Sequence, residues 1–483
     1  MKIILLSLIL GLFSQNVLLS GEKEPNVIQL DSRLELFVDH YLIDTLIDTR
    51  LVLQKPRDEG PVLKFDNPWE GHLCGYCTVI KDRDIYRLYY RGMPPYDEDG
   101  TYHETTCYAE SKDGIHWVKP NLRLFEVNGT LDNNVVLANT DRRVSHNFSP
   151  IIDTKPGVDP NQRFKALGGD LEFGLIAYTS PDGIHWQKLQ EEPVFKKGRF
   201  DSQNVSFWSE SEQCYLCYFR GRKGHYDKFR SVDRTTSKDF INWTEPVLMG
   251  YGDAPVEHIY TSQTSPYFRA PHIYIAIAAR FMEGRQVLTE EQAFQIGVNP
   301  RFFKDCSDAV LMTTRGGSQY DRTFMEGFIR PGIGLENWVS RTNYPALNVV
   351  QTGPTEMSVY LNQDYAQPTA HLRRYSLRLD GFASVSAPYK GGEMITKAFT
   401  FSGEKLYINF STSAAGEIRI EIQDVDGQPI PGYSLADSQI LIGNEIERVV
   451  TWENGQDVSQ LAGKPVRLRF VMKDADLYAL HFN

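Results

Sequence analysis

From residue 66 onward the chain is written in short alternating runs of apolar and polar residues separated by turn signals. Side chains on a strand alternate between two faces, so these runs predict half-buried strands. One unit recurs: Ser-x-Asp-Gly-Ile-His-Trp stands at 111–117 and at 180–186, and Ser-x-Asp-Phe-Ile-Asn-Trp at 237–243. Asp-Gly between apolar runs is a hairpin signal. Each copy is therefore expected to be a tight turn that joins two strands.

The strands around these turns group into five similar units. Each unit has an inner strand, a Tyr-rich second strand, a third strand that ends at the turn, and a fourth strand; the inner strands are expected at 75–82, 148–154, 204–210, 259–268 and 356–363. Radial repetition of four-stranded sheets is a β-propeller, which protects its sheet edges by closing the ring. We expect an all-β fold, a five-bladed β-propeller over 66–388; a stack of β-sandwiches is the alternative.

Both ends of the chain differ from the repeats. From residue 389 to 483 the alternating strands are shorter, which predicts a separate C-terminal β-sandwich. Residues 1–21 carry one Lys and then an apolar run, Ile3 to Phe13, that is too short to span a bilayer. This pattern predicts a cleaved signal peptide and a secreted or periplasmic protein without a membrane anchor. Residues 22–65 are expected to be an N-terminal lead-in.

The net charge and the cysteine content limit which partners and cofactors the protein is expected to bind. The formal net charge of −11 gives no basic footprint for a nucleic acid. Six cysteines include two C-x-x-C pairs, Cys74/Cys77 and Cys214/Cys217, which invite a zinc interpretation. Residues three apart on a strand point to opposite faces, so structural cysteines are favoured. No metal site or cofactor is expected, while a structural cation and the disulfide pairing stay open.

Five units with Ser-x-Asp-Gly-x-x-Trp turns, preceded by a signal peptide and followed by a sandwich, resemble the five-bladed propeller glycosidases of the arabinanase and levanase/invertase families. The resemblance covers most of residues 66–483. It implies that acidic residues stand at the starts of the inner strands, where the pocket opens. The turns and their Trp117, Trp186 and Trp243 then lie at the opposite end and build the blades.

Four blades offer a carboxylate at the expected pocket end. Glycoside cleavage needs two such groups, one protonated and one ionised; the candidate catalytic residues are Glu257, Asp201, Glu70 and Glu356. By resemblance, Glu257 matches the family's acid in the fourth blade and Asp201 its auxiliary Asp in the third. The family's Asp of the first blade is absent, because Gly75 and Tyr76 stand there. The structural alternative is that each acid merely caps a loop or pairs with a nearby Arg.

Three second strands end in arginine, and the same topology places these residues at the pocket end. Guanidiniums match carboxylate and sulfate oxygens, and residues 221–230 add local positive charge; the candidate substrate-binding residues are Arg91, Arg220, Arg280, His72, His146 and His258. We expect a glycoside hydrolase for a poly- or oligosaccharide, possibly sulfated or uronic. The alternatives are a non-catalytic glycan-binding propeller and a sialidase-like enzyme with Tyr76 or Tyr260 as nucleophile.

Overall fold

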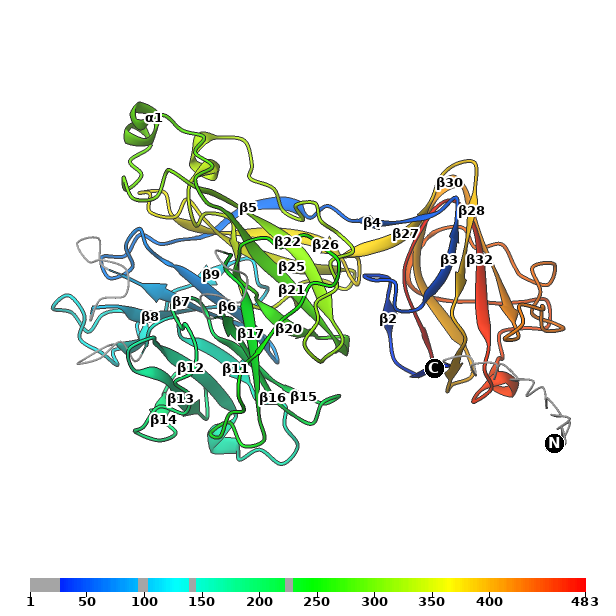
Figure 1. The fold of residues 1–483 in the computed structure, drawn as a ribbon, viewed down its shortest axis with the longest axis horizontal. Helices are drawn as coiled ribbons and strands as arrows, with labels where there is room; N and C mark the ends of the chain where they lie inside the picture. Colours follow the sequence, from blue (N-terminus) through cyan, green and yellow to red (C-terminus); the bar gives the residue numbers. More distant parts are fainter. Residues whose placement is uncertain (1–26, 94–102, 139–144, 222–228) are drawn as a thin grey trace, which may run out of the picture.

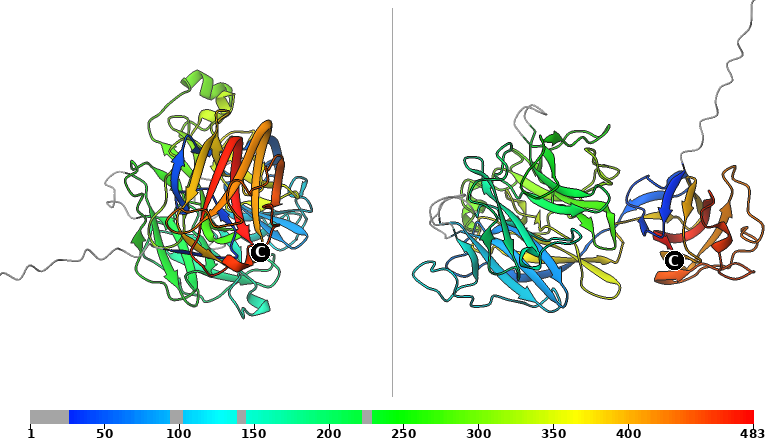
Figure 2. Two further views of the ribbon diagram at one scale, coloured as in Figure 1. Left: turned by 90° about the vertical axis from the view of Figure 1, so that its right-hand side faces the viewer. Right: turned by 90° about the horizontal axis from the view of Figure 1, so that it is seen from below.

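The computed structural model describes residues 27–93, 103–138, 145–221 and 229–483 (Figure 1). The expected signal peptide lies outside these residues. Two β lobes, a propeller and a C-terminal domain, are joined by the ribbon of β4 (Arg50–Leu53) and β27 (Ala383–Ala387) (Figures 1 and 2). The described residues form a single α-helix, α1 (Glu290–Gln295). In this part of the chain no helix is long and apolar enough to cross a membrane.

The propeller has five blades, as predicted. Blade 1 contains β6 (Gly75–Asp82), β7 (Ile85–Gly92), β8 (Thr105–Ser111), β9 (Trp117–Val118) and β10 (Val135–Ala138). Blade 2 contains β11 (Ser149–Ile152), β12 (Phe164–Asp170), β13 (Gly174–Ser180) and β14 (Gln187–Lys188). Blade 3 contains β15 (Val205–Ser209), β16 (Cys214–Arg220), β17 (Val232–Ser237) and β18 (Val247–Leu248). Blade 4 contains β19 (Ile259–Thr261), β20 (Thr264–Tyr267), β21 (Ala270–Met282) and β22 (Cys306–Thr314).

The strands of blade 5 differ from the predicted assignment. Its inner strand is split into β23 (Tyr344–Pro345) and β24 (Val350–Gln351), followed by β25 (Glu356–Gln363), β26 (His371–Arg378) and, at the outer edge, β5 (Arg57–Lys64). The prediction that 356–363 is an inner strand is wrong, because β25 lies second in this sheet. The lead-in also supplies β5, so the N-terminal part of the chain closes the ring.

The strand register defines two ends of the propeller. Gly75 at the start of β6 lies opposite Arg91 at the end of β7. Ser111, which opens the first repeated turn, lies opposite Tyr86 at the start of β7. We call the end where the inner strands begin the site end, and the end with the repeated turns the turn end.

The repeated turns share one hydrogen-bond pattern. In the second copy, Asp182 Oδ1 accepts the backbone N–H groups of Ile184 and His185, each at 2.9 Å, and Ser180 Oγ accepts that of Gly183 at 2.9 Å. Burial raises the pKa of Asp182, but these backbone bonds and the His185 side chain outweigh it and lower the pKa to about 2. The motif thus fixes the turn by local hydrogen bonds.

The tryptophans of the motif pack at the turn end, as predicted. The rings of Trp117, Trp186 and Trp243 make edge-on contacts with Tyr360, Phe148 and Phe240, at 5.9, 4.9 and 5.5 Å between centroids. The turns also join neighbouring blades, since Tyr89 of blade 1 donates its hydroxyl hydrogen to the Gly183 carbonyl of blade 2 at 2.8 Å.

The C-terminal domain takes strands from both ends of the chain. Its main sheet contains β2 (Glu35–Leu36), β3 (Ile43–Ile47), β28 (Gly392–Thr396), β30 (Leu406–Gln423), β31 (Asn444–Val449) and β32 (Arg467–Phe482), and β1 (Ile28–Asp31) pairs with β29 (Phe399–Phe401). These strands enclose one apolar core. The lead-in therefore supplies β1, β2 and β3 to this domain. Its two-layered sandwich form stays a prediction.

Candidate functional site

Three arginines surround one tyrosine ring at the site end. The guanidinium carbons of Arg220, Arg230 and Arg341 lie 5.8, 5.1 and 5.6 Å from the ring centroid of Tyr260. They come from three separate places: the end of β16 in blade 3, the segment before β17, and the segment before β23 in blade 5. We call these four residues the arginine cluster. Cations at this distance are attracted by the negative face of the ring.

Arg91 extends this arrangement toward blade 1. Its Nη2 donates to the carbonyl of Leu73 at 2.8 Å and to the hydroxyl of Tyr365 at 2.9 Å. The guanidinium lies 4.8 Å from the ring of Tyr76. Arg341 Nη1 reaches the same Tyr365 hydroxyl at 3.5 Å. The Tyr365 hydroxyl therefore joins Arg91 to the arginine cluster.

A buried chain of polar groups holds Arg91 from the blade 2 side. Asn147 Oδ1 accepts from Arg91 Nη1 at 3.4 Å, and Asn147 Nδ2 donates to His146 Nε2 at 2.9 Å. His146 Nδ1 then donates to Glu104 Oε2 at 2.8 Å, because Nε2 already acts as the acceptor. Glu104 is fully buried and Asn147 is 1% exposed. This chain fixes the tautomer and orientation of the imidazole.

A second polar network supports the site from below. Gln203 Nε2 donates to Thr78 Oγ1 at 2.7 Å, and Gln263 Nε2 donates to Gln203 Oε1 at 2.7 Å and to the Pro345 carbonyl at 2.8 Å. These residues belong to blades 1, 3, 4 and 5, and all are buried. Direct hydrogen bonds therefore connect the blades near the propeller axis and limit movement of the strands that carry the site.

Asp201 and Glu257 stand at the site end, but arginines engage both. Asp201 is bound by Arg220 and keeps half of its side chain exposed (50%). Glu257 accepts from Arg280 Nη1 at 3.0 Å through one oxygen and from Arg322 Nη2 at 2.7 Å through the other. A guanidinium has no acceptor to which a carboxyl proton could be donated. Both carboxylates therefore form ion pairs with arginine, as the structural alternative expects.

Arg280 is occupied by carboxylates within blade 4. Its Nη2 and Nε donate to the two oxygens of Asp308 at 2.6 and 2.8 Å. The Asp308 hydrogen bond raises the pKa of the guanidinium, although burial opposes the shift. The structure thus places Arg280 with Glu257 and Asp308, and the three arginines around Tyr260 are Arg220, Arg230 and Arg341.

The other two predicted acids lie elsewhere. Glu70 is fully buried and accepts from Lys119 Nζ at 2.8 Å and from the hydroxyl of Tyr90. Glu356 lies at the turn end, where it accepts from Arg374 Nη1 at 2.9 Å. The prediction that Glu356 lies at the pocket is therefore wrong, because it assumed that residues 356–363 form an inner strand.

The predicted histidines take three different positions. His146 belongs to the chain that holds Arg91. His258 Nδ1 accepts the backbone N–H of Arg230 at 3.1 Å and so supports the arginine cluster. His72 lines a separate cavity beside α1, and burial lowers the pKa of its imidazole. Sequence reasoning did not find Glu104, Asn147, Arg341 or Tyr365, because these residues stand in loops or in single short segments without a repeat.

The described residues hold no group of three or more His, Cys, Asp or Glu side chains that could bind a metal ion. All six cysteines are described, buried and unpaired. Cys214 and Cys217 belong to the apolar clusters on opposite sides of blade 3, as the strand alternation predicts. Burial raises the pKa of the Cys217 thiol, which suits a structural role.

No family model and no curated protein matches the chain. Among solved structures, it is similar to a fructofuranosidase variant from Schwanniomyces occidentalis complexed with fructosylnystose (TM-score 0.40, 11% identity, 87% of this chain and 96% of that chain). Others are a β-fructofuranosidase from Bombyx mori (TM-score 0.42, 9%, 87% and 94%) and a β-1,2-mannobiose phosphorylase from Listeria innocua (TM-score 0.42, 10%, 68% and 97%). Similarity at this level does not assign the chain to a family.

Proposed function

We propose that this protein is a secreted, carbohydrate-active propeller that binds an anionic saccharide at its site end. The observation that carries the proposal is the arginine cluster, in which three guanidiniums from two blades and one connecting segment lie within 6 Å of the Tyr260 ring. The saccharide half rests on the resemblance of the repeats to five-bladed glycosidases. Secretion rests on the expected signal peptide.

The chemistry of the cluster favours an anion. Like charges held close together repel each other, and a bound carboxylate or sulfate relieves this repulsion. Guanidinium donors also match the oxygens of both groups in a forked geometry. Tyr260 is buried and packs against Phe281 and Tyr344, so its ring positions the guanidiniums and does not itself offer a face to a sugar. The cluster therefore supplies the charged contacts that the acidic group of a sugar needs.

Hydrolysis of the bound saccharide is the second candidate function, and Asp201 is the observation that favours it. This carboxylate stands directly before the blade 3 inner strand and is half exposed. The sialidase-like alternative uses Tyr76 or Tyr260 as the nucleophile instead. Both forms of hydrolysis predict release of reducing ends or free acidic sugar, whereas a binding propeller releases neither.

Calorimetric titration with sulfated or uronic oligosaccharides and their neutral counterparts tests the proposal. Arg220→Ala should weaken binding of the anionic ligand about ten- to a hundredfold, as expected for loss of a charged hydrogen bond. Its ion partner Asp201 is half exposed, so it is not left in a dry interior. Arg57→Ala removes a guanidinium that is 71% exposed at the turn end and should change nothing. Equal losses on neutral and anionic ligands would contradict the anion site.

Product analysis of the same incubations separates binding from hydrolysis. If the protein hydrolyses its ligand, Asp201→Asn should reduce product release while leaving most of the binding intact, because the amide keeps the shape but not the charge. Glu257→Gln tests the acid assigned by resemblance in the same way. Binding without product in the parent protein would reject hydrolysis and leave a recognition module.

A further inference from the structure

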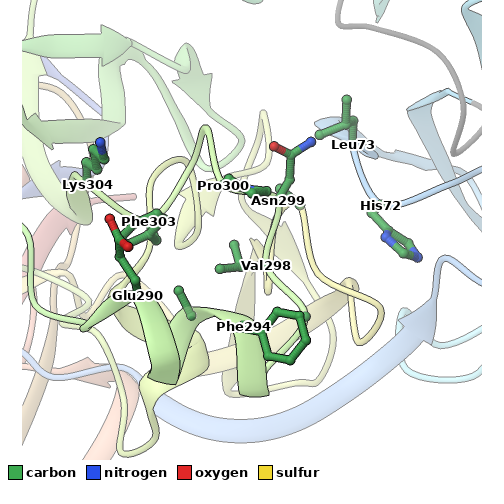
Figure 3. Close-up of a pocket in the computed structure, with 12 residues that line it drawn as sticks. His72, Leu73, Glu290, Phe294, Val298, Asn299, Pro300, Phe303 and Lys304 are labelled. Carbon is green, nitrogen blue, oxygen red and sulfur yellow. The ribbon is translucent and has the colours of Figure 1, made fainter.

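A cavity of about 710 Å³ lies beside the site end, under the segment that carries α1 (Figure 3). This segment, residues 283–305, is an insertion between β21 and β22. The apolar part of the lining includes Leu73, Ala293, Phe294, Val298, Pro300 and Phe303. Size and lining suit a small organic ligand, because such sites are mostly apolar with a few polar groups.

Only one layer of residues separates this cavity from the arginine cluster. Phe302 packs on the cluster side, with its ring 4.9 Å from the Arg341 guanidinium carbon and 5.4 Å from the Tyr365 ring. The next residue, Phe303, lines the cavity, and so does Ala366, the residue after Tyr365. In each of these two segments, one residue therefore contacts the arginine cluster or its Tyr365 partner, and the next residue lines the cavity.

The blade 1 segment forms the same kind of shared wall. The carbonyl of Leu73 accepts from Arg91 at 2.8 Å, while Leu73 itself lines the cavity. Beside it, the carbonyl of His72 accepts the backbone N–H of Ala366 at 2.8 Å, and the carbonyl of Ala366 accepts that of Asn299 at 2.9 Å. Backbone hydrogen bonds therefore fix the cavity wall to the residues that hold Arg91.

Phe294 presents a bare aromatic ring at this cavity. It is 85% exposed, whereas its neighbour Ala293 is 3% exposed and anchors α1. A capping box fixes the start of the helix: Gln292 N–H donates to Thr289 Oγ1 at 3.2 Å, and Thr289 N–H donates to Gln292 Oε1 at 2.9 Å. The start of the helix is therefore fixed, and the Phe294 ring stands largely uncovered on it.

Polar groups stand around the apolar lining. Glu290, Asn299, Lys304 and His72 complete the wall (Figure 3). Together they offer donors and acceptors for sugar hydroxyl groups. An apolar floor with such a polar rim matches the two faces of a pyranose ring, whose C–H groups pack on aromatic carbon while its hydroxyls form hydrogen bonds.

We infer that this cavity binds the sugar units that continue outward from the anionic unit at the arginine cluster, with Phe294 as the stacking platform. The inference rests on the proposed function, because the shared wall places the two sites within reach of neighbouring units of one saccharide chain. The insertion then determines which chain lengths the protein prefers.

Chondroitin sulfate oligosaccharides of two and of eight units, which carry both carboxylate and sulfate groups, test this inference by calorimetric titration. The parent protein should bind the octasaccharide more tightly than the disaccharide. Phe294→Ala should weaken octasaccharide binding about five- to tenfold, as expected for loss of an aromatic contact, and leave disaccharide binding within about twofold. Phe268→Ala, a matched change of a 41% exposed ring at the turn end, should affect neither ligand.

The outcomes separate this inference from the proposed function. If neither length binds the parent protein, the proposed function fails and the inference with it. If both lengths bind and Arg220→Ala weakens both, but Phe294→Ala weakens neither or both equally, only the outer subsite is overturned. Unchanged thermal unfolding midpoints of the Phe294 and Phe268 variants show that the folds are comparable.

Discussion

At the scale of single residues, Phe240 shows how one position can combine strain and packing. It occupies the third turn where the other two copies have Gly114 and Gly183, and all three residues have a positive φ, of 69°, 74° and 77°. For a residue with a Cβ this conformation costs about 1–2 kcal/mol. The Phe240 ring is fully buried against Tyr215, at 5.1 Å between centroids. Burial of the ring therefore offsets the backbone strain.

Two substitutions separate these effects. Phe240→Ala loses the buried ring and keeps the strain, so it should destabilise the protein by about 3–5 kcal/mol. Phe240→Gly loses the same ring but relieves the strain, so it should be about 1 kcal/mol more stable than the Ala variant. Urea unfolding measures both. The usual order, with Ala above Gly, would show that the turn is not strained.

The candidate site shows what sequence could reveal at this scale. Arg91 and Arg220 were found because each ends a second strand in a recognisable repeat. Arg341 was not, since it follows an irregular segment and itself has a positive φ of 60°. Tyr365 was not, because β25, the strand that precedes it, was assigned as an inner strand. The position of a residue within a repeat can be recognised from the sequence. Which loops of different blades come close together depends on how the ring closes, and the sequence does not show this.

At the scale of elements, the closing strand β5 is the feature that periodicity could not identify. Only one residue of its sequence, Arg-Asp-Glu-Gly-Pro-Val-Leu-Lys, is buried, and the strand contains Gly60 and Pro61, which strand interiors usually avoid. An edge strand tolerates both residues. Blade 5 was misread for a related reason: its inner strand is broken, so the regular alternation of β25 took its place in the prediction.

Leu63 is the buried anchor of this closing strand and gives a test of its role. The side chain packs in the apolar cluster shared by blades 1 and 5. Leu63→Ala should destabilise the protein by about 2–4 kcal/mol, and hydrogen exchange should quicken at the amides of β26, the partner of β5. Pro61→Ala, at an exposed position of the same strand, is the control. Unchanged protection of β26 after Leu63→Ala would show that the ring does not depend on this closure.

At the scale of the whole molecule, a buried ion cluster joins the two lobes. Arg315 follows β22 of the propeller; it donates to Glu35 at 2.9 Å and to Asp39 at 3.0 Å, both in the segment that belongs to the C-terminal domain. The two carboxylates are 1% and 6% exposed. Burial raises the pKa of Glu35, but hydrogen bonds from His272 and Arg315 outweigh it and lower the pKa. The contribution of Glu35 is therefore present above its unfolded pKa and is lost as the pH falls below about 4.

Removing the shared cation should uncouple the lobes. Arg315→Met removes the shared guanidinium from two buried carboxylates, of which Glu35 keeps only His272. Breaking a buried pair costs about 3–5 kcal/mol. Differential scanning calorimetry should then show two separate unfolding transitions where the parent protein shows one. Lys390→Ala breaks an exposed pair with Asp48 inside the C-terminal domain, worth about 1 kcal/mol or less, and is the control. Adding Glu35→Gln and Asp39→Asn to Arg315→Met should restore part of the coupling, because no unpaired buried charge remains. The opposite outcome is a single transition in Arg315→Met whose midpoint shifts no more than that of the control. It would show that the apolar contacts of Leu36 and Val38 with blades 4 and 5 hold the lobes together alone.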